Sequence, residues 1–353
     1  MAYKYKHFIP QNTAPSGAKS IGVYNSNGEK VCSIPLGRMS PPTKEKLYSF
    51  GLVSDIHLYP VAAVEWYPER KFRNALTYFQ SNGCAMCIVC GDLTQTGFYR
   101  ERTLDDGTKE KYFDDAQMME YKNIREEFTM PVYALCGNHE NYNKNVTENL
   151  DELENVIGVR ELSFSISNAI ATNRNVQVTA IGNDVFILCG QPNAAYVMSD
   201  ADFTWLSETL EANKDKRCFV FIHAYIEEDS GDPLDVRENS IFEHWGTTKK
   251  TAFINLLNQY NNVILFHGHS HMKFKHQEHD VCANYTDKNG FKSVHIPSLA
   301  TPRDINFDTM QSVDDRTASE GYIVDVYDNC IVLNGMDLIN NEYVPLGVYK
   351  IGT

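Results

Sequence analysis

Five short blocks of the sequence place aspartate, asparagine and histidine side chains at spacings that suit metal binding. In chain order they are Asp55-Ile56-His57, Gly91-Asp92, Gly137-Asn138-His139-Glu140, His223 and Gly268-His269-Ser270-His271. Side chains two residues apart in extended backbone point the same way, so the first and last blocks could each present two ligands to one ion. Two neighbouring divalent ions need imidazole nitrogen mixed with hard oxygen, and one carboxylate able to bridge them. The blocks therefore predict a centre that binds two metal ions.

Each block taken alone has an ordinary structural explanation. A single buried histidine is more often a hydrogen-bonded core residue than a ligand, and Gly-Asp or Gly-Asn is common in turns. The order of the blocks is the informative feature, because each one follows a predicted strand. Ligand sites of α/β sheets form at the carboxyl ends of strands. The glycines before Asp92, Asn138 and His269 would let the backbone turn sharply and approach an ion closely.

The elements that must position these blocks alternate between strand and helix from Leu47 onward. Apolar runs predict strands at residues 47–54, 84–90, 131–136, 185–189, 218–222 and 263–266. Helical spacing and capping signals predict helices at residues 69–80, 114–128, 199–210 and 247–258. Residues 272–353 contain short runs with β character and no obvious helix. This order predicts an α/β catalytic domain over residues 47–353, with a β-rich C-terminal part.

The first 46 residues are predicted to form a separate segment. Residues 20–24 and 30–35 flank an Asn-Gly turn and predict a β-hairpin, and residues 37–42 predict a linker. A hairpin docked on the edge of the main domain is the simpler interpretation. A module that attaches a protein partner is the alternative, and the sequence does not choose between them.

Composition limits the partners and the compartment. The 353 residues contain 32 Lys and Arg against 46 Asp and Glu, a formal charge of −14. This balance disfavours binding to duplex nucleic acid. A small anionic substrate still fits, because bound metal ions reverse the local field. Neither a secretory signal nor a membrane span is expected, because no long apolar stretch occurs. Nine cysteines, several in apolar runs, favour a reducing, cytoplasmic setting.

Three of these cysteines, Cys84, Cys87 and Cys90, have the spacing of a metal-binding motif. They lie in an apolar run that is predicted to be a strand. Side chains three residues apart in a strand point to opposite faces, so the thiols should not converge on one ion. We interpret them as core residues.

The five blocks, in this order, resemble the calcineurin-like metallophosphoesterases over about residues 47–300. Within that family the chain is most similar to the class III cyclic-nucleotide phosphodiesterases, through the stretches GDLTQTG, PVYALCGNHE and SDADFTWLSETLEANKDKRCFVFIH. The resemblance implies a four-layer αββα sandwich of two mixed β-sheets with a dimetal centre at one edge.

The resemblance also implies a role for each site residue. One ion would be bound by Asp55, His57, Asp92 and His271. The other would be bound by Asp92, Asn138, His223 and His269, with Asp92 as the bridge. His139 would face the phosphate and stabilise or protonate the leaving oxygen. The two divalent ions, Mn²⁺, Fe²⁺/Fe³⁺ or Zn²⁺, would activate a bridging hydroxide that attacks phosphorus in line.

The sequence departs from the family pattern near two of the blocks. Glu140 stands where aspartate is commoner, so its link to His139 is expected to be longer. After His223 comes Ala-Tyr, where relatives often have His or Pro, which leaves the substrate-facing surface open. The acidic residues 227–235 read as a solvated loop or, if they lie over the site, as a barrier to highly charged substrates. Tyr142 and Asn143 are candidate substrate contacts.

Hydrolysis of a small phosphodiester, such as a cyclic or other small nucleotide, is the favoured function. A phosphomonoesterase, including a protein phosphatase, would share the metal centre, so the ligands do not separate the two. A non-catalytic scaffold that keeps the fold is a third alternative. It is disfavoured because no ligand is missing from the blocks.

Overall fold

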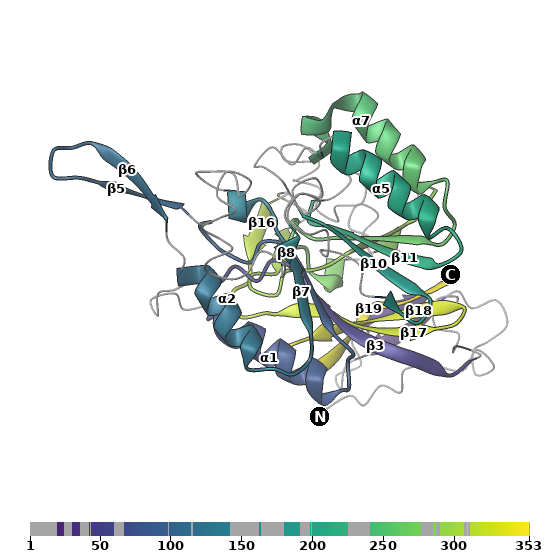
Figure 1. The fold of residues 1–353 in the computed structure, drawn as a ribbon. Coiled ribbons are helices and arrows are strands. Elements are labelled where there is room, and N and C mark those ends of the chain that lie inside the picture. Colours follow the sequence, from purple (N-terminus) through teal and green to yellow (C-terminus); the bar gives the residue numbers. More distant parts are fainter. Residues whose placement is uncertain are drawn as a thin grey trace.

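Two mixed β-sheets lie face to face at the centre of the fold (Figure 1). The computed structural model describes residues 42, 44–59, 67–97, 99–113, 116–141, 162–163, 180–190, 198, 200–224, 241–276, 285–286, 290–306, 309 and 311–352, and the strands at 20–24 and 30–35. The seven-stranded sheet has the order β19 (Glu342–Gly352), β18 (Cys330–Asp337), β17 (Glu320–Tyr327), β3 (Lys46–Val53), β4 (Cys87–Cys90), β7 (Val132–Leu135) and β8 (Leu162–Ser163). The six-stranded sheet has the order β13 (Tyr285–Thr286), β14 (Lys292–His295), β12 (Val263–His267), β11 (Arg217–Ile222), β10 (Asp184–Cys189) and β9 (Ala180–Ile181).

Helices cover the outer face of each sheet. The cover of the seven-stranded sheet is formed by α1 (Pro68–Ser81) and α2 (Ala116–Glu126). The cover of the six-stranded sheet is formed by α5 (Asp200–Ala212) and α7 (Ile241–Leu257). Each helix buries an apolar side against its sheet, which is the main source of helix stability in a folded domain. The layers confirm the predicted αββα sandwich.

Aromatic side chains fill the space between the two sheets. Phe50 of β3 meets Phe186 of β10 with ring centroids 5.3 Å apart, and Phe186 lies 4.9 Å from Phe219 of β11. Phe221 stacks on Phe266 at 5.0 Å. All five rings are fully buried. Edge-to-face and offset pairs of this kind stabilise by about 0.5–1.5 kcal/mol beyond their buried area, so they hold the sheets in fixed register.

The predicted elements from residue 47 onward are confirmed, with shifted ends. The strand predicted from Cys84 begins at Cys87, and the helix predicted from residue 247 begins at Ile241. Cys87 packs toward the α1 and α2 layer, whereas Cys90 packs between the sheets, so their thiols diverge as expected. The C-terminal strands β17, β18 and β19 are longer than the short runs predicted there.

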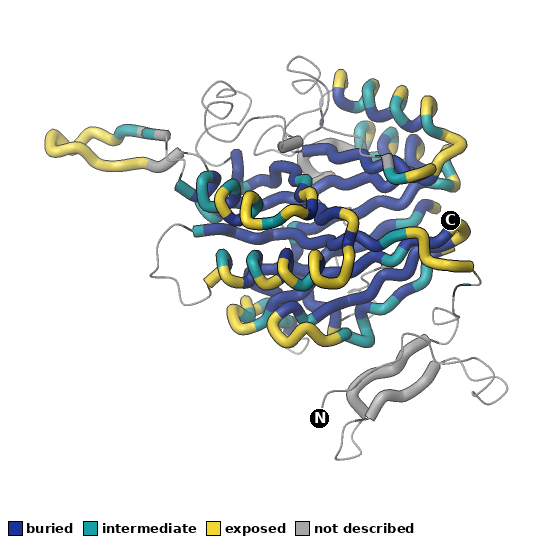
Figure 2. The backbone as a smooth tube through the Cα atoms, turned by 60° about the horizontal axis from the view of Figure 1, so that its bottom comes forward, coloured by how far each residue is buried: buried dark blue, intermediate teal, exposed yellow. Residues whose placement is uncertain are grey.

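Two small hairpins were not predicted. One, formed by β5 (Tyr99–Thr103) and β6 (Lys109–Phe113), projects from the body as an arm between β4 and α2 (Figure 1). Figure 2 shows that most of this arm is exposed. The other is formed by β15 (Arg303–Asn306) and β16 (Gln311–Asp314). Both are rich in charged and polar residues, so they lack the apolar alternation that signals a strand.

The predicted N-terminal hairpin agrees with the strand pairing. β1 (Ser20–Tyr24) and β2 (Lys30–Pro35) are antiparallel partners. The boundary at residue 46, between this segment and the catalytic domain, remains a prediction. None of the helices in the described part of the chain is long and apolar enough to cross a membrane.

A buried ion pair joins the two sheets. The guanidinium of Arg217 donates to both carboxylate oxygens of Asp184, each at 2.7 Å, and to the carbonyl oxygen of Tyr327 at 2.7 Å. The hydroxyl of Tyr48 donates to the same carboxylate at 2.5 Å. Arg217 and Asp184 belong to the six-stranded sheet, whereas Tyr48 and Tyr327 belong to the seven-stranded sheet. The hydrogen bonds of the Arg217 guanidinium and the Asp184 carboxylate therefore connect the two sheets.

We expect Arg217→Met to lower the free energy of unfolding by about 3–5 kcal/mol, because it leaves the Asp184 carboxylate buried without its cation. Urea denaturation would measure this change. Arg73→Met is the matched control, since Arg73 forms an exposed pair with Glu127 and should contribute less than about 1 kcal/mol. Equal losses in the two variants would contradict the assignment.

Candidate metal centre

The five predicted blocks meet at one edge of the sandwich. Three of them follow β3, β4 and β7 of one sheet, and two follow β11 and β12 of the other. Among the predicted site residues, His139 and His269 are partly exposed and the rest are buried. Distances of 3.0–3.9 Å between their polar atoms connect all eight: Asp55, His57, Asp92, Asn138, His139, His223, His269 and His271.

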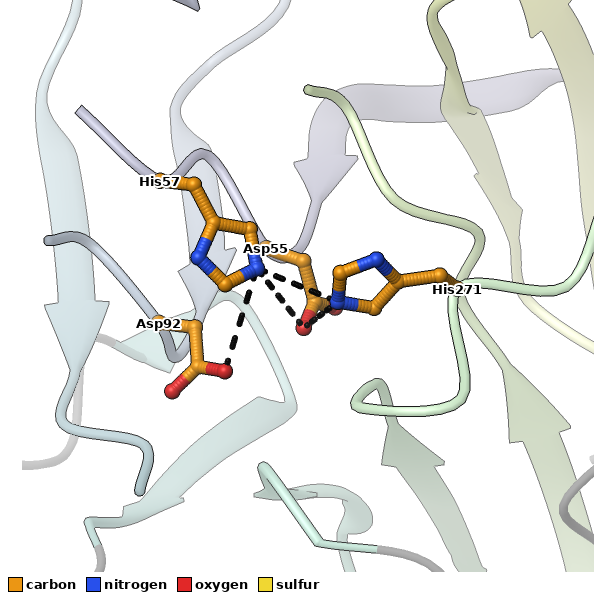
Figure 3. A group of neighbouring side chains, drawn as sticks. All are labelled: Asp55, His57, Asp92 and His271. Carbon is orange, nitrogen blue, oxygen red and sulfur yellow. Dashed lines mark hydrogen bonds and ion pairs between the residues drawn. The ribbon is translucent and has the colours of Figure 1, made fainter. Parts of the chain in front are cut away.

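One group of ligand atoms comes from Asp55, His57, Asp92 and His271, whose side chains point toward one another (Figure 3). The Nε2 atoms of His57 and His271 are 3.1 Å apart, and His271 Nε2 is 3.0 Å from Asp55 Oδ1. Two ring nitrogens this close repel each other unless a proton or a cation lies between them. Two bonds of about 2.1 Å that meet at a right angle on one ion separate their ligand atoms by about 3 Å. The first group therefore fits one metal ion.

The second group comes from Asp92, Asn138, His223 and His269. Asn138 Oδ1 lies 3.1 Å from His223 Nε2 and 3.1 Å from His269 Nδ1. His223 Nε2 is also 3.1 Å from Asp92 Oδ2. The ligand atoms of Asp92, His223 and His269 all lie within 4.8 Å of one another. These separations fit a second ion as well as the first group fits its own.

Asp92 belongs to both groups through a single oxygen. Its Oδ2 is 3.1 Å from His223 Nε2 in the second group and 3.9 Å from His57 Nε2 in the first. Its other oxygen, Oδ1, accepts the backbone N–H of His139 at 2.9 Å. Asp55 is held in the same way, since its Oδ2 accepts the backbone N–H of His269 at 3.1 Å. Each carboxylate thus has one oxygen fixed by the backbone and the other turned toward the cluster.

Backbone carbonyls fix two of the imidazole rings. His223 Nδ1 lies 2.7 Å from the carbonyl oxygen of Cys90, and His271 Nδ1 lies 3.1 Å from that of Thr301. Donation from Nδ1–H to these carbonyls leaves the Nε2 lone pair free for a metal. The hydroxyl of Thr301 lies at the same distance, 3.1 Å, from His271 Nδ1. Thr301 was not predicted, because it lies outside the five blocks.

The backbone at the predicted ligands is strained. Seven described residues other than glycine have a positive φ, and five of them are Asp55, His57, Asp92, His269 and His271, with φ between 44° and 71°. This region is disfavoured for residues with a Cβ, and such strain concentrates at functional sites. Sharp turns are predicted at the glycines, whereas most of the positive φ angles in the blocks occur at the predicted ligands.

The three glycines that precede ligands are required mainly for space. Of these, only Gly91 has a positive φ, at 89°. A Cβ at Gly91 would overlap the ring of His223, one at Gly137 would overlap Asp92, and one at Gly268 would overlap the hydroxyl of Ser54. These glycines therefore lie close to protein side chains, two of which belong to the cluster, and the predicted close approach to an ion remains a prediction.

Charges within the cluster shift the pKa values of its members. Burial alone would raise the pKa of Asp55 and Asp92, but the imidazoles around them hold both below the usual carboxyl range. Burial alone would lower the pKa of His223, but Asp92 and Asp55 raise it to about 10. Burial and the neighbouring His223 lower the pKa of His269 to about 3. The two carboxylates thus create a field that favours a cation at the centre of the cluster.

Glu140 does not take the place expected for it beside the His139 ring. Its Oε1 accepts the N–H and the hydroxyl of Thr94 at 2.8 and 2.9 Å, and its Oε2 accepts the N–H of Gly137 at 2.7 Å. His139 Nδ1 instead lies 2.7 Å from the carbonyl oxygen of Gln95. The longer side chain therefore joins the loops after β4 and β7, and a backbone group orients His139.

The other residues singled out in the sequence lie apart from this geometry. His267, which precedes the last block, ends β12 as a buried residue with its ring against that of His295. Tyr142, Asn143 and residues 227–235 lie outside the described residues.

A fold and ligand arrangement of this kind are typical of dinuclear metallohydrolases. The chain belongs to the calcineurin-like phosphoesterase family, whose sequence model matches residues 48–273. Its fold is similar to that of a dimetal phosphatase from Danio rerio, with a TM-score of 0.51 and 14% identity over 87% of this chain and 99% of that one. A phosphoesterase from E. coli gives a TM-score of 0.34 and 11% identity over 84% and 96% of the two chains. No curated protein sequence matches the chain.

Family membership and the buried aspartate–histidine cluster make the chain a metallophosphoesterase. The residues present fit the two metal ions that the family implies.

We expect Gly137→Ala to lower metal affinity by about 10–100-fold, because the added Cβ would displace the Asp92 carboxylate. Metal content after dialysis against buffers of set free-metal concentration would measure this change. Gly352→Ala is the control, because a Cβ there would meet nothing within 4 Å. Unchanged metal content in the Gly137 variant would contradict the packing argument.

Proposed function

We propose that the chain hydrolyses a phosphodiester with two divalent ions, and that the substrate is a cyclic or other small nucleotide. The observation that carries this proposal is the Oδ2 of Asp92, which lies within 3.1 Å of a ligand atom of one group and 3.9 Å of a ligand atom of the other. A shared carboxylate of this kind holds two ions close enough to act on one phosphate. When bound, such a pair neutralises the phosphate oxygens and activates a water molecule.

The protein contributes ligands, orientation and a proton donor. In the proposal, Asp55, His57 and His271 hold one ion, Asn138, His223 and His269 hold the other, and Asp92 bridges the two. Asn138 reaches the second group with its amide oxygen, so the block after β7 supplies a neutral ligand. With two carboxylates against two divalent ions, the loaded centre keeps a positive charge that attracts an anionic phosphate.

His139 is the proposed proton donor. It lies at the partly exposed side of the cluster, with Nε2 3.7 Å from Asp92 Oδ2. Its Nδ1 is engaged by the Gln95 carbonyl, so the proton on Nε2 is the one available to a leaving oxygen. General acid catalysis of this type contributes roughly 10²–10⁴-fold.

Preference for a diester rests on the similarity of GDLTQTG and of the stretch leading into GNHE to the class III cyclic-nucleotide phosphodiesterases. A phosphomonoesterase is the alternative, and the Danio rerio protein with a similar fold is described as a phosphatase. A scaffold without activity is the weakest alternative, because none of the side chains proposed as ligands is missing from the sequence. We also propose Mn²⁺, Fe²⁺/Fe³⁺ or Zn²⁺ as the ions, because carboxylate and amide oxygens suit Mn²⁺ whereas imidazoles suit Fe and Zn. A cytoplasmic location remains a prediction from the sequence.

Metal-reconstituted protein should hydrolyse bis-p-nitrophenyl phosphate faster than p-nitrophenyl phosphate, and Mn²⁺ should support the reaction. Asp92→Asn should lower activity by orders of magnitude, because one charge serves both ions. Steady-state rates with each ester and metal analysis of both proteins would test this. Preference for the monoester would favour the phosphatase. Near-normal turnover in the variant would rule out the ligand assignment.

His139→Ala should keep both ions and slow the hydrolysis of diesters that have poor leaving groups by roughly 10²–10⁴-fold. The metals are retained because the contact that fixes Asp92 comes from the backbone N–H of residue 139, which alanine keeps. Rates with phenyl and with 2,4-dinitrophenyl leaving groups, together with metal content, would test this. Loss of metal would show that His139 is a ligand.

A further inference from the structure

The segment from Thr94 to Gly97 carries the group that orients His139. It leaves the metal centre two residues after Asp92 and runs to the base of the β5–β6 arm. The carbonyl oxygen of Gln95, within this segment, lies 2.7 Å from His139 Nδ1. The direction of this carbonyl therefore sets the direction of the imidazole.

The side chain of Gln117 fastens this segment from the first turn of α2. Its Oε1 accepts the N–H of Gln95 at 2.8 Å and the N–H of Thr96 at 3.1 Å. Its Nε2 donates to the hydroxyl of Thr96 at 2.6 Å and to the carbonyl of Gly97 at 3.3 Å. Gln117 is fully buried. An amide has two acceptor lone pairs and two donor hydrogens, so its whole hydrogen-bonding capacity is used on three consecutive residues.

One peptide plane connects Gln117 to His139. The N–H of Thr96 and the C=O of Gln95 belong to the same peptide unit, and in a trans peptide these two groups point in opposite directions. Gln117 binds the N–H at one end of the plane, and His139 Nδ1 meets the C=O at the other. Rotation of this plane would break both contacts together.

We propose that Gln117 is a positioning residue for the general acid, acting on His139 through the peptide unit between Gln95 and Thr96. This proposal rests on the proposed role of His139. Glutamine suits the position because the segment requires both acceptor and donors: glutamate would lose the donors, and leucine would lose all four bonds. Gln117 also connects residues 95–97, which precede the β5–β6 arm, directly to α2, which follows it. The position of the Gln95 carbonyl therefore does not depend on the arm.

Leaving-group dependence distinguishes positioning from general support of the fold. A misplaced acid slows esters with poor leaving groups and has little effect on good ones, which leave without protonation. We expect Gln117→Leu to lower kcat/KM for a phenyl diester by about 10–100-fold, and for a 2,4-dinitrophenyl diester by less than about threefold. Metal content should be unchanged. In the His139→Ala background, Gln117→Leu should cause no further loss, because the group that it positions is absent.

Gln80→Leu is the matched control. The Oε1 of Gln80 accepts the N–H and hydroxyl of Thr129 and the N–H of Met130, so it also fastens a loop, on α1 away from the centre. Its loss should affect both leaving groups alike. Gln117→Glu keeps an acceptor for the N–H of Thr96 and should show a smaller leaving-group-dependent loss than leucine. If Gln117→Leu does not fold, the leaving-group dependence of Gln117→Glu tests the proposal in its place.

Equal losses for both leaving groups in the Gln117 variants, or full additivity with His139→Ala, would overturn the proposal. Failure of the proposed role of His139 would be recognised separately, from the His139→Ala variant alone. If His139→Ala alone slows both diesters equally, His139 is not the acid, whatever Gln117 does.

Discussion

Two carboxylates buried side by side form the constraint on which the rest of the centre depends. Asp55 and Asp92 are almost fully buried, and each has one oxygen directed at the same small group of imidazoles. Burying like charges together is costly unless hydrogen bonds and cations compensate them. The backbone supplies one N–H to each carboxylate, and the histidines supply the remainder when no metal is bound. The high pKa of His223, about 10, follows from this demand for positive charge. Divalent ions would compensate the same two carboxylate charges. The burial of Asp55 and Asp92 is therefore also what makes the cluster favourable for a metal ion.

Holding the ligands in strained backbone requires support from the sheets, and the structure provides it by extending the strand ladder. Beyond β3 and β4, the N–H of Asp55 donates to the carbonyl of Gly91 at 3.0 Å, and that of His57 donates to the carbonyl of Asp92 at 3.0 Å. On the other sheet, the N–H of Gly268 donates to the carbonyl of His223 at 2.9 Å. The loops thus remain paired after the strands end. Positive φ angles there are tolerated because these bonds and the buried aromatic core over-determine the local conformation.

The clustered side chains were predictable from the sequence, and the groups that orient them were not. Aspartate, asparagine and histidine after apolar strands are visible in the chain because these side chains can bind metal, and all eight predicted site residues lie together. Gln95 acts through its backbone carbonyl, which any residue could provide. Thr301 contacts His271 through its carbonyl and its hydroxyl, but it lies outside the five blocks. Gln117 lies on a helix that periodicity predicted, yet its contact depends on where that helix docks. The β5–β6 arm escaped prediction because charged residues such as Arg102 and Glu110 face each other across its strands, and the apolar pattern that signals a strand is missing.

The short turn that begins at His139 shows why the Gly-Asn-His-Glu block forms a unit. Asn138 sends its amide oxygen to the second ligand group, the N–H of His139 fixes Asp92, and the carboxylate of Glu140 binds back to Gly137 and across to Thr94. The ring of His139 is left to turn toward Gln95. Because Glu140 ties Thr94 and Gln117 ties the next three residues, the ring of His139 contacts a segment held from both sides. The groups that fix Asp92 and those that orient the His139 ring therefore share one piece of backbone.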